Sequence, residues 1–384
     1  MTSPVASQRI VRIEWARLEG QRPRPAGGNA RLGAHGQVVR PPIARLTLDD
    51  GTTGFGFSRA TREQAQALAG RRFDEVFSYQ RGPGEAWLAF EYPLWDLAGR
   101  LAGVPVYALA ATINGRPVPA SLRVPCYDTS LYFDDLHLAD DVAAAARIAA
   151  EAMEGYARGH RAFKLKVGRG ARHLPLEEGT RRDIAVVRAV RESVGPDARL
   201  MLDANNGYNL NLAKRVLAET AGCRVFWLEE AFHEDAELYR DLRAWLDRER
   251  LGVLIADGEG QASPSLMAWA SEHVIDVVQY DIFSPGFTRW LEIGRQLDAW
   301  GVRAAPHHYG GLYGNYVSPH LAGAIERYTF AEWDEASTPA LDTSAYRIEE
   351  GKVAVPNLPG FGLALDDTLF RRAVADGGYE VSAP

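Results

Sequence analysis

The sequence predicts an α/β protein, built as a TIM-type (β/α)8 barrel with an N-terminal α+β capping domain. Two observations predict this fold class. The chain of 384 residues is too long for one small core and long enough for a barrel and a second domain. After about residue 123, short apolar strand-like segments alternate with helix-like segments, whereas the residues before it lack this alternation.

The capping domain is expected over residues 1–122. Strand-like segments cover residues 10–15 and 43–48, and a loop rich in Gly, Pro and Arg is expected between them, over residues 19–37. A structureless loop of this length in a compact domain is usually functional or disordered. The C-terminal tail, residues 342–384, returns to strand and turn character, and we expect it to pack back on the capping domain.

One helix of the capping domain is expected over residues 85–102. Its apolar residues follow helical spacing, namely Trp87, Phe90, Leu94, Leu97 and Leu101. Pro93 lies inside this run and predicts a kink, because proline removes a backbone donor and clashes with the preceding turn.

The barrel domain is expected over residues 123–341, where eight strand-like segments recur. They cover residues 124–130, 162–167, 199–204, 225–230, 252–257, 275–282, 302–307 and 328–333. No strand–GxGxxG–helix unit occurs early in this region, which argues against a dinucleotide-binding sheet. In a (β/α)8 barrel the carboxyl ends of the strands meet at one rim, and active sites lie at that rim.

The composition excludes several classes of function. A net charge of -7 without a long basic run argues against binding to nucleic acid or to an anionic membrane. No continuous apolar stretch is long enough for a membrane span, and Met1–Gln8 lack the apolar core of a signal peptide. The two cysteines, Cys126 and Cys223, lie in apolar strand-like contexts that suit buried thiols in a reducing compartment. We therefore expect a cytoplasmic protein.

Acidic residues end three successive strands of the expected barrel, namely Asp203, Glu229 and Glu259. Each alone would be explained as a solvated strand-end residue or a helix cap. Three carboxylates that converge on one side of the rim repel one another unless a cation neutralises them. Oxygen-only ligands favour magnesium or manganese over zinc. We therefore expect these three residues to bind Mg²⁺, with Mn²⁺ as the alternative.

Two lysines, Lys164 and Lys166, lie on the second strand. Strand side chains alternate, so both lysines face the same way. A lone lysine commonly extends to solvent, but two lysines beside three acids indicate a reactive site. We expect a lysine next to a metal ion and a second lysine to have a lowered pKa and to act as a base.

His307 ends the seventh strand, and taken alone it is as compatible with a structural role as with a catalytic one. Asp281, on the adjacent sixth strand, is expected to hold a ring nitrogen of His307 and to complete an acid–base pair. Strands two and seven lie on roughly opposite sides of a barrel, so Lys166 and His307 are expected to approach a central substrate from two faces. Glu332, on the eighth strand, is expected to hydrogen-bond a substrate carboxylate if protonated; the alternative is an ordinary salt-bridged carboxylate.

Taken together, these motifs resemble the mandelate racemase group of the enolase superfamily. They are Lys164-x-Lys166, Asp203-x-Asn205, Trp227-Leu228-Glu229-Glu230, Gly258-Glu259, Asp281 and His307. In the first domain, Asp49-Asp50-Gly51-x-x-Gly54-x-Gly56 and Leu94-Trp95-Asp96-Leu97-Ala98-Gly99 are similar to the capping-domain motifs of that group. The chain departs from the pattern where Ala231 follows the paired glutamates and where His308 and Tyr309 follow His307.

The resemblance implies a role for each of these residues. Enolase-superfamily sites combine a Lys or His base with magnesium. The implied metal ligands are Asp203, Glu229 and Glu259; the implied acid–base groups are Lys166 and His307 with Asp281. Lys164 and Glu332 are implied to bind the substrate carboxylate and the developing enolate. We expect further substrate contacts from Asn205, Arg22 and His35.

The leading hypothesis for function is Mg²⁺-dependent removal of the proton next to a substrate carboxylate, followed by loss of the 3-hydroxyl. This reaction would dehydrate a sugar acid, an aldonate or aldarate, to a 2-keto-3-deoxy acid. The same residues would serve a racemase or epimerase, and a barrel that binds an acid without catalysis is a further alternative. The loop around Arg22–His35 is expected to close over the polyol. The expected partners are a small carboxylate substrate and, in a homo-oligomer, copies of the chain.

Overall fold

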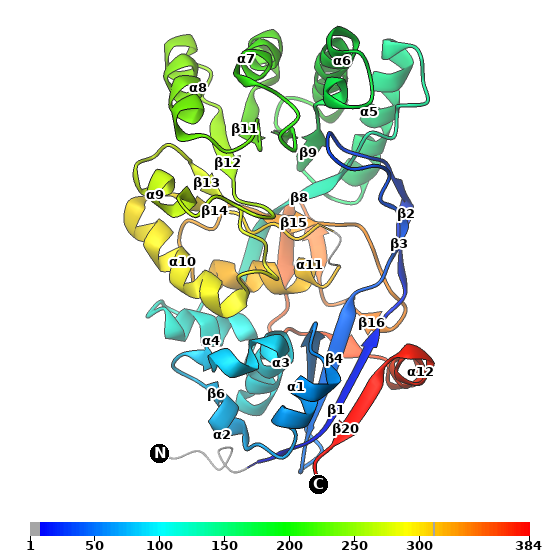
Figure 1. Cartoon of the computed structure of the whole chain (residues 1–384), viewed down its shortest axis with the longest axis vertical. Helices are drawn as coiled ribbons and strands as arrows, with labels where there is room; N and C mark the ends of the chain where they lie inside the picture. The colour runs from blue at the N-terminus through cyan, green and yellow to red at the C-terminus, as the bar shows by residue number, and fades with distance from the viewer. Residues whose placement is uncertain (1–7, 310–311) are drawn as a thin grey trace.

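The structure, a computed structural model, describes residues 8–309 and 312–384. Of the segment Met1–Gln8, whose composition argues against a signal peptide, only Gln8 lies among the described residues. Figure 1 shows two parts stacked along the long axis, with the blue, cyan and red elements below and the green to orange elements above. Among the helices that the structure describes, none combines the length and the apolar character that a membrane crossing requires.

The lower part is built on a four-stranded antiparallel sheet with the order β20-β1-β4-β5. Its strands are β1 (Ile10–Arg17), β4 (Pro42–Leu48), β5 (Thr53–Phe57) and β20 (Tyr379–Ser382). The other elements of this part are α1 (Arg62–Leu68), α2 (Phe73–Val76), β6 (Phe77–Ser78), β7 (Gly82–Pro83), α3 (Glu91–Ala102), α4 (Val106–Ile113) and α12 (Asp367–Gly377). Gly54 lets α3 approach β5 closely, because a Cβ there would lie 2.6 Å from the backbone nitrogen of Leu97.

The helix expected over residues 85–102 is divided into two segments. A 3-10 helix covers Glu85–Phe90, and α3 begins at Glu91. Pro93 therefore lies in the first turn of α3, where a backbone N–H would have no helical partner. The predicted kink at Pro93 is therefore wrong, because α3 begins just before this proline and does not bend at it.

The segment rich in Gly, Pro and Arg is more regular than expected. The strands β2 (Gly20–Ala26) and β3 (Gly36–Val39) pair antiparallel, and only residues 27–35 connect them as a loop. The pair extends upward from the lower part along the side of the upper part (Figure 1). The expectation of a structureless loop over residues 19–37 is therefore wrong, because β2 carries no alternation of apolar residues by which a strand is recognised.

The upper part contains a ten-stranded, mainly parallel sheet with the order β14-β13-β12-β11-β10-β9-β8-β18-β17, and β15 also pairs with β8. Its parallel strands are β8 (Leu122–Leu131), β9 (Ala162–Lys166), β10 (Arg199–Asp203), β11 (Val225–Glu229), β12 (Leu254–Asp257), β13 (Val277–Val278), β14 (Arg303–Ala304) and β15 (Ala331–Trp333). A strand lies in each of the eight expected segments, although all but the first are shorter than predicted, most of all the last three. Between β14 and the segment that leads into β15, the described pairing is the single parallel bridge from Ala304 to Tyr328.

Helices alternate with these strands. They are α5 (Asp141–Ala157), α6 (Leu176–Val194), α7 (Leu210–Glu219), α8 (Ala236–Glu249), α9 (Leu266–Ser271), α10 (Phe287–Trp300) and α11 (Gly314–Val317). The short strands of the C-terminal tail are β16 (Leu341–Asp342), β17 (Arg347–Glu349), β18 (Lys352–Val355) and β19 (Ala364–Leu365). The tail contacts both parts, because β18 pairs with β8 and β20 pairs with β1.

One apolar cluster joins the strands of the large sheet. It consists of Tyr127, Ala162, Met201, Trp227, Ala256, Val277, Ala305 and Phe330. Side chains two positions apart on a strand face the same side. Asp203 follows Met201 by two residues, and Glu229 follows Trp227 by two residues. Both acidic side chains therefore lie at one end of this cluster.

Candidate active site

The register of the parallel strands aligns three of the predicted site residues. Asp203 is the register partner of both Lys166 on β9 and Glu229 on β11. All three side chains are buried. Glu259 lies two residues beyond the end of β12, after Gly258, whose φ of +123° is rarely adopted by L residues. The glycine permits the turn after which Glu259 reaches the ends of the neighbouring strands.

Asp203, Glu229 and Glu259 lie close enough to hold one metal ion. One oxygen from each carboxylate lies within 4.8 Å of the others. The Oε2 atom of Glu259 is buried and lies 3.1 Å from His307 Nε2, without a well-aligned hydrogen bond among the described residues. A buried carboxylate oxygen without a well-aligned donor, beside two further carboxylates, favours a bound cation, because burial of such a group is otherwise costly. The ligand set is composed only of oxygen atoms, so these residues fit the expected Mg²⁺.

Lys164 and Lys166 both reach this carboxylate cluster, as their shared strand face predicts. The Nζ of Lys164 lies 2.6 Å from Glu229 Oε1 and 3.2 Å from Glu332 Oε1. The Nζ of Lys166 donates to Asp203 Oδ2. Both lysines are buried. Each positive charge is therefore held by a carboxylate of the same site.

The pKa of Lys166 is raised within this cluster, and the lowering expected for a lysine next to a bound metal ion stays a prediction. Burial and the neighbouring Lys164 disfavour the charged form, but Asp203, Glu259 and Glu229 together outweigh them. The pKa of Lys164 is also raised, because Glu229 and Glu332 outweigh its burial. Burial and Asp203 raise the pKa of Glu229.

His307 follows β14 and faces the same cluster. Its Nε2 lies 3.1 Å from Glu259 Oε2 and its Nδ1 lies 3.5 Å from Asp281 Oδ2. Burial lowers the pKa of His307, but Glu259 and Glu332 outweigh this effect and raise the pKa to about 10. Asp281 is oriented by the backbone N–H of Phe283, which donates to its Oδ1 at 2.8 Å. The structure thus brings the predicted pair together, although Nδ1 has no well-aligned partner among the described residues.

Glu332 is fully buried and holds Lys164. Its Oε1 accepts from Thr129 Oγ1 at 2.6 Å, and its Oε2 accepts from the backbone N–H of His308 at 2.7 Å. Burial raises the pKa of Glu332, but Lys164 and His307 outweigh it and hold the pKa well below its ordinary value. The salt-bridged alternative describes this carboxylate in the structure, and its expected hydrogen bond with a substrate carboxylate stays a prediction.

Asn205 lies in the turn after β10, with a φ of +42°. Its Nδ2 donates to Glu230 Oε2 at 2.8 Å and to Glu259 Oε1 at 3.1 Å. Asn205 therefore orients a predicted metal ligand. Its Oδ1 is buried without a partner among the described residues, and its expected contact with the substrate stays a prediction.

Arg22 and His35 lie near the site on and after β2. Arg22 is buried and forms a two-point ion pair with Asp334, at 3.2 Å from Nε to Oδ1 and 3.0 Å from Nη2 to Oδ2. Its guanidinium also lies 4.7 Å from the ring centroid of Tyr309. The charge of Arg22 is thus engaged within the protein, and its expected substrate contact stays a prediction.

His35 packs edge-on against Tyr132 and Tyr309, with ring centroids 4.9 and 5.2 Å apart. Burial, with a smaller effect of Lys166 and Arg22, lowers the pKa of His35 to about 4. The Nε2 of His35 is buried and has no partner among the described residues. Because Lys166 lies 5.3 Å from the Tyr132 ring centroid, His35 brings a neutral ring with an unpaired nitrogen close to the lysine.

Several residues of the site were missed by the sequence analysis. Gln279 Nε2 donates to Glu229 Oε2 at 2.8 Å, and Trp227 Nε1 donates to the same oxygen at 3.1 Å. Strand alternation could have indicated both residues. Gln279 lies two residues before Asp281, and Trp227 lies two residues before Glu229, so each faces the same side as a predicted site residue. Thr129 and Tyr132 on and after β8 carry no charge, so no pattern singled them out.

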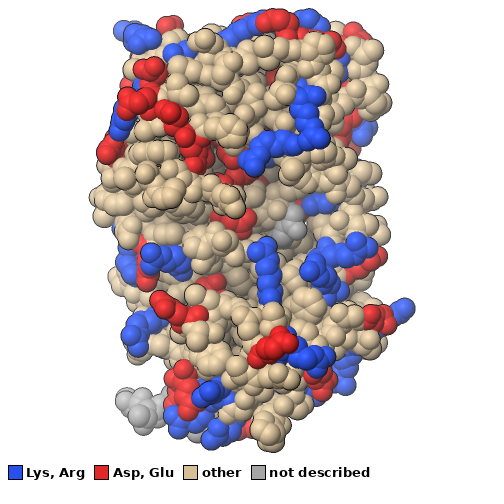
Figure 2. Space-filling model, in the orientation of Figure 1, with Lys and Arg blue, Asp and Glu red and all other residues tan. Residues whose placement is uncertain are grey.

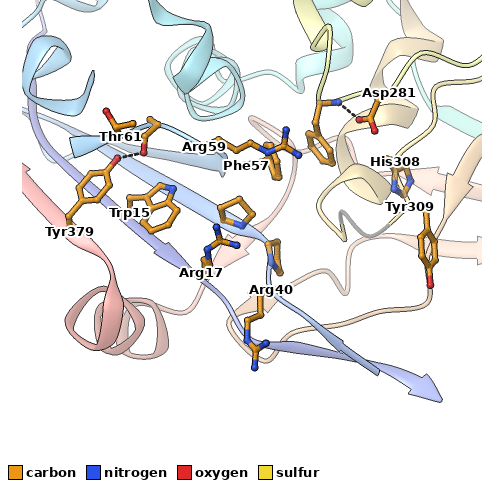
Figure 3. A pocket seen from close by; sticks show the side chains of 14 residues that line it. Trp15, Arg17, Arg40, Phe57, Arg59, Thr61, Asp281, His308, Tyr309 and Tyr379 are labelled. Atoms are coloured by element: carbon orange, nitrogen blue, oxygen red, sulfur yellow. Dashed lines mark hydrogen bonds between the residues drawn. The ribbon is translucent and has the colours of Figure 1, made fainter. Parts of the chain in front are cut away.

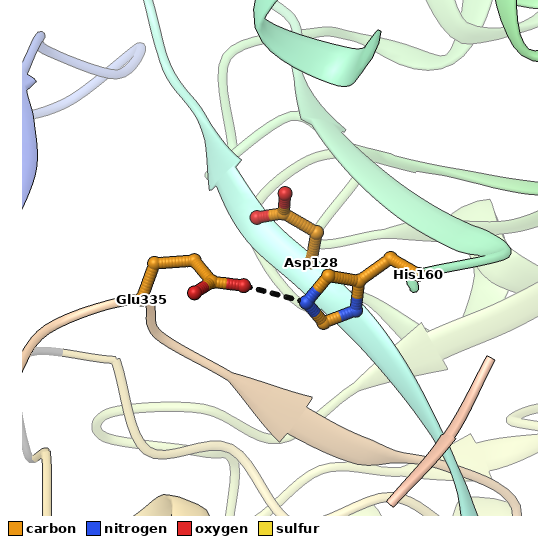
Figure 4. A group of neighbouring side chains, drawn as sticks. All are labelled: Asp128, His160 and Glu335. Atoms are coloured by element: carbon orange, nitrogen blue, oxygen red, sulfur yellow. Dashed lines mark hydrogen bonds and ion pairs between the residues drawn. The ribbon is translucent and has the colours of Figure 1, made fainter. Parts of the chain in front are cut away.

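A second group of side chains has the composition of a metal site, namely Asp128, His160 and Glu335 (Figure 4). His160 Nε2 lies 2.7 Å from Glu335 Oε1. Burial lowers the pKa of His160, but hydrogen bonds with Cys126 and Glu335 outweigh it and raise the pKa to about 10. Arg158 contacts Asp128 at 3.6 Å and Glu335 at 3.2 Å. An arginine and a protonated histidine already balance the two carboxylates, so this group is an internal ion cluster.

Three carboxylates, two lysines and a histidine lie together at the strand ends of a mainly parallel sheet. Such a group forms an acid–base site that suits a divalent cation. Residues 147–369 match the family model of enolase C-terminal domain-like proteins. This match covers more than half of the chain. The chain therefore belongs to the mandelate racemase/muconate lactonizing enzyme family of the enolase superfamily, and the resemblance of its motifs is confirmed.

The chain is similar over its whole length to galacturonate dehydratase from Geobacillus sp. A mutant of that enzyme complexed with Mg is 50% identical, with a TM-score of 0.96 over 100% of this chain and 99% of that chain. A structure of the enzyme complexed with D-galacturonate and 5-keto-4-deoxy-D-galacturonate is 50% identical, with a TM-score of 0.93 over 98% and 99% of the two chains. The D-galactarolactone cycloisomerase of Agrobacterium fabrum is 27% identical over 84% of this chain and 88% of its own length.

Proposed function

We propose that this chain is a magnesium-dependent sugar-acid dehydratase, an enzyme of the lyase class that removes water from a sugar carrying a carboxylate. The observation that carries the proposal is the convergence of Lys166, three carboxylates and His307 at the ends of neighbouring strands. The likeness to galacturonate dehydratase at 50% identity supports it.

Asp203, Glu229 and Glu259 would hold the magnesium ion, and manganese is the alternative. When bound, the ion would stabilise the negative charge that develops on the substrate carboxylate as the neighbouring proton leaves. Asn205 and Gln279 keep two of these ligands in place, because each donates a hydrogen bond to one of them. We therefore assign Asn205 and Gln279 a positioning role.

Lys166 would act, in its neutral form, as the base that removes the proton from the carbon next to the carboxylate. A metal ion bound by Asp203, Glu229 and Glu259 would offset the negative charge that raises the pKa of this lysine. Lys166 ends β9 level with Asp203, so its Nζ lies beside the carboxylates that would hold the metal ion. The electrons of the broken C–H bond form the enediolate. Lys164 stays charged between Glu229 and Glu332 and binds the substrate carboxylate. Glu332 positions Lys164, because hydrogen bonds from Thr129 and His308 fix both of its oxygens.

His307 gives a proton to the departing hydroxyl group, which leaves as water. Four strands separate β9 from β14 in the sheet, so Lys166 and His307 approach the substrate from different sides. Loss of the hydroxyl converts the enediolate into an enol, which becomes the keto-deoxy acid by tautomerisation. Asp281 orients the His307 ring through Nδ1. Lys166 thus acts on the carbon next to the carboxylate, and His307 acts on the hydroxyl group of the following carbon.

The loop of residues 27–35 covers the hydroxyl-bearing part of the substrate. The unpaired Nε2 of His35 is available to hydrogen-bond a substrate hydroxyl group. Arg22 positions this loop through its ion pair with Asp334. We therefore expect the loop to influence which sugar acid is accepted.

An isomerase is the second candidate, because a curated relative is a cycloisomerase. A base on each side of the reacting carbon would also invert its configuration. In deuterated water, an epimerase would place solvent deuterium in both diastereomers without loss of water. A dehydratase would give a keto-deoxy acid.

We also propose that the parallel sheet closes into a (β/α)8 barrel over residues 123–341. The pairing of β15 with β8 and the bridge from Ala304 to Tyr328 support closure. Residues 1–122 with the tail 342–384 would form the capping domain, which the pairing of β20 with β1 supports. The cytoplasmic location and the homo-oligomer stay predictions from the sequence.

The test is a screen of sugar acids, including D-galacturonate, with Mg²⁺ present and keto-acid formation as the readout. The matched control is Glu229→Gln, which keeps the size of a metal ligand and removes its charge. We expect at least one acid to lose water with the wild-type enzyme and none with the variant. Exchange or inversion at the reacting carbon without loss of water from any acid would favour the isomerase.

A further inference from the structure

A pocket of about 610 Å³ lies between the two parts of the molecule (Figure 3). On one side it is lined by residues in and after β1 and β5. On the other side it is lined by Asp281, Phe283, His308 and Tyr309, which follow β13 and β14. The volume is within the range of small-molecule sites. None of the three carboxylates proposed as metal ligands lines it, so this pocket is distinct from the metal site.

One end of the pocket lies beside His307, the residue proposed to give a proton to the departing hydroxyl group. The rings of Phe57 and Phe283 stack with centroids 3.8 Å apart and join the two walls. The backbone N–H of Phe283 donates to Asp281, and Asp281 lies 3.5 Å from His307. A ligand in this pocket would therefore lie on the side of the site from which His307 acts.

Three arginines line the pocket, namely Arg17, Arg40 and Arg59 (Figure 3). Arg40 is engaged with Glu19 at 3.3 Å. Arg17 and Arg59 make no ion pair with any carboxylate that the structure describes, and each lies against an aromatic ring. Among the described lining residues, Asp281 is the one acid. The pocket therefore carries an excess of positive charge, and Figure 2 shows basic side chains (blue) on the face of the molecule between its two parts.

This excess is notable because the chain as a whole has a net charge of -7. An exposed arginine alone is usually solvated, but two unpaired arginines at one concave site attract and retain an anion. A guanidinium group matches the geometry of a carboxylate, since it donates two parallel hydrogen bonds. The chemistry of the pocket thus favours a carboxylate as its ligand.

We propose that Arg17 and Arg59 bind a second carboxylate, at the end of the sugar acid that is remote from the reacting carbon. The enzyme then prefers a sugar diacid to a monoacid with the same carbon chain. This inference rests on the proposed function, because it takes the reacting end of the substrate to lie at Asp203, Glu229 and Glu259. It goes beyond that function by naming the group at the other end.

The test compares three acids with the carbon chain of D-galacturonate. They are D-galacturonate itself, the diacid made by oxidising its aldehyde, and the monoacid alcohol made by reducing it. The enzymes are the wild type, Arg17→Gln, Arg59→Gln and the control Arg81→Gln. Arg81 is exposed in the lower part and lies outside the pocket. The readouts are kcat/KM with Mg²⁺ and calorimetric binding of the diacid in EDTA, which needs no turnover.

We expect the wild type to favour the diacid and each pocket variant to lose about tenfold in kcat/KM for it, since hydrogen bonds between charged groups are involved. The loss for the alcohol should be small, and Arg81→Gln should match the wild type. Diacid binding in EDTA should weaken in the pocket variants by a similar factor. Equal losses for all three acids, or unchanged binding of the diacid, would overturn the assignment. Failure of every acid to react, with binding still sensitive to Arg17 and Arg59, would count against the proposed function alone.

Discussion

Replacement of Arg22 by alanine tests whether this arginine anchors the β2–β3 pair or binds the substrate. Arg22 and Asp334 are 6% and 0% exposed, and two contacts of 3.2 and 3.0 Å join them. Removing the guanidinium leaves the Asp334 carboxylate buried without its cation. Breaking one partner of a buried pair costs about 3–5 kcal/mol. We expect Arg22→Ala to lower the free energy of unfolding by about this amount.

The double variant Arg22→Ala/Asp334→Ala is the matched comparison. It leaves neither charge buried alone, so it should be more stable than Arg22→Ala. Urea unfolding followed by circular dichroism measures both, and KM for the best acid is measured beside them. An Arg22→Ala protein with unchanged unfolding and a raised KM would refute the anchoring role and restore Arg22 as a substrate ligand.

Three further predictions concern the metal, the loop and a buried carboxyl. Glu229→Gln, or treatment of the wild type with EDTA, should abolish activity while the circular dichroism spectrum is retained; undiminished turnover in EDTA would exclude the metal. Exchange of loop residues 29–34 should change the relative rates on several sugar acids far more than the urea midpoint, and unaltered relative rates would remove the loop from the site. Burial raises the pKa of Glu91 to about 7, although Phe287 and Thr288 donate backbone N–H groups to it. The ordinary pKa of a glutamate is about 4.3, so the folded protein keeps a proton that the unfolded chain has lost between these pH values. Stability should therefore fall by up to about 3–4 kcal/mol as the pH rises through this window. Glu91→Gln should remove the slope, and an equal slope in both proteins would contradict the assignment.

The sequence predicted most of the elements that position the site, because its strands are apolar and its helices are amphipathic. The β2–β3 pair escaped prediction, since Pro23 and Pro25 and the arginines of this segment leave no apolar face to recognise. The strands β13 and β14 are only two residues long, whereas their apolar runs suggested longer ones. An apolar run indicates that a segment is buried. Burial alone does not determine where the hydrogen bonds between neighbouring strands end.

The candidate site was predicted as a set of residues, but apart from the Asp281–His307 pair the contacts between them were not predicted. The positions of Asp203, Glu229 and Glu259 at successive strand ends predicted a metal site, because three converging carboxylates need a cation to neutralise them. The ionised state of Glu332 was not predictable, since it depends on Thr129 and on a backbone N–H that only the folded chain brings near. Charge states at such a site follow from contacts rather than from residue types.

The central claim is that Lys166 removes the proton and His307 assists the departure of the hydroxyl group. Proton NMR of the preferred acid in deuterated water, with Lys166→Ala and His307→Asn, tests it most directly. We predict that Lys166→Ala stops exchange of the proton next to the carboxylate. His307→Asn should stop product formation while exchange by Lys166 continues, because the enediolate can be reprotonated by the same lysine. Positioned acid–base groups contribute about 10²–10⁴ in rate, so either loss is measurable. Exchange that persists in Lys166→Ala and disappears in His307→Asn would contradict this assignment and reverse the two roles.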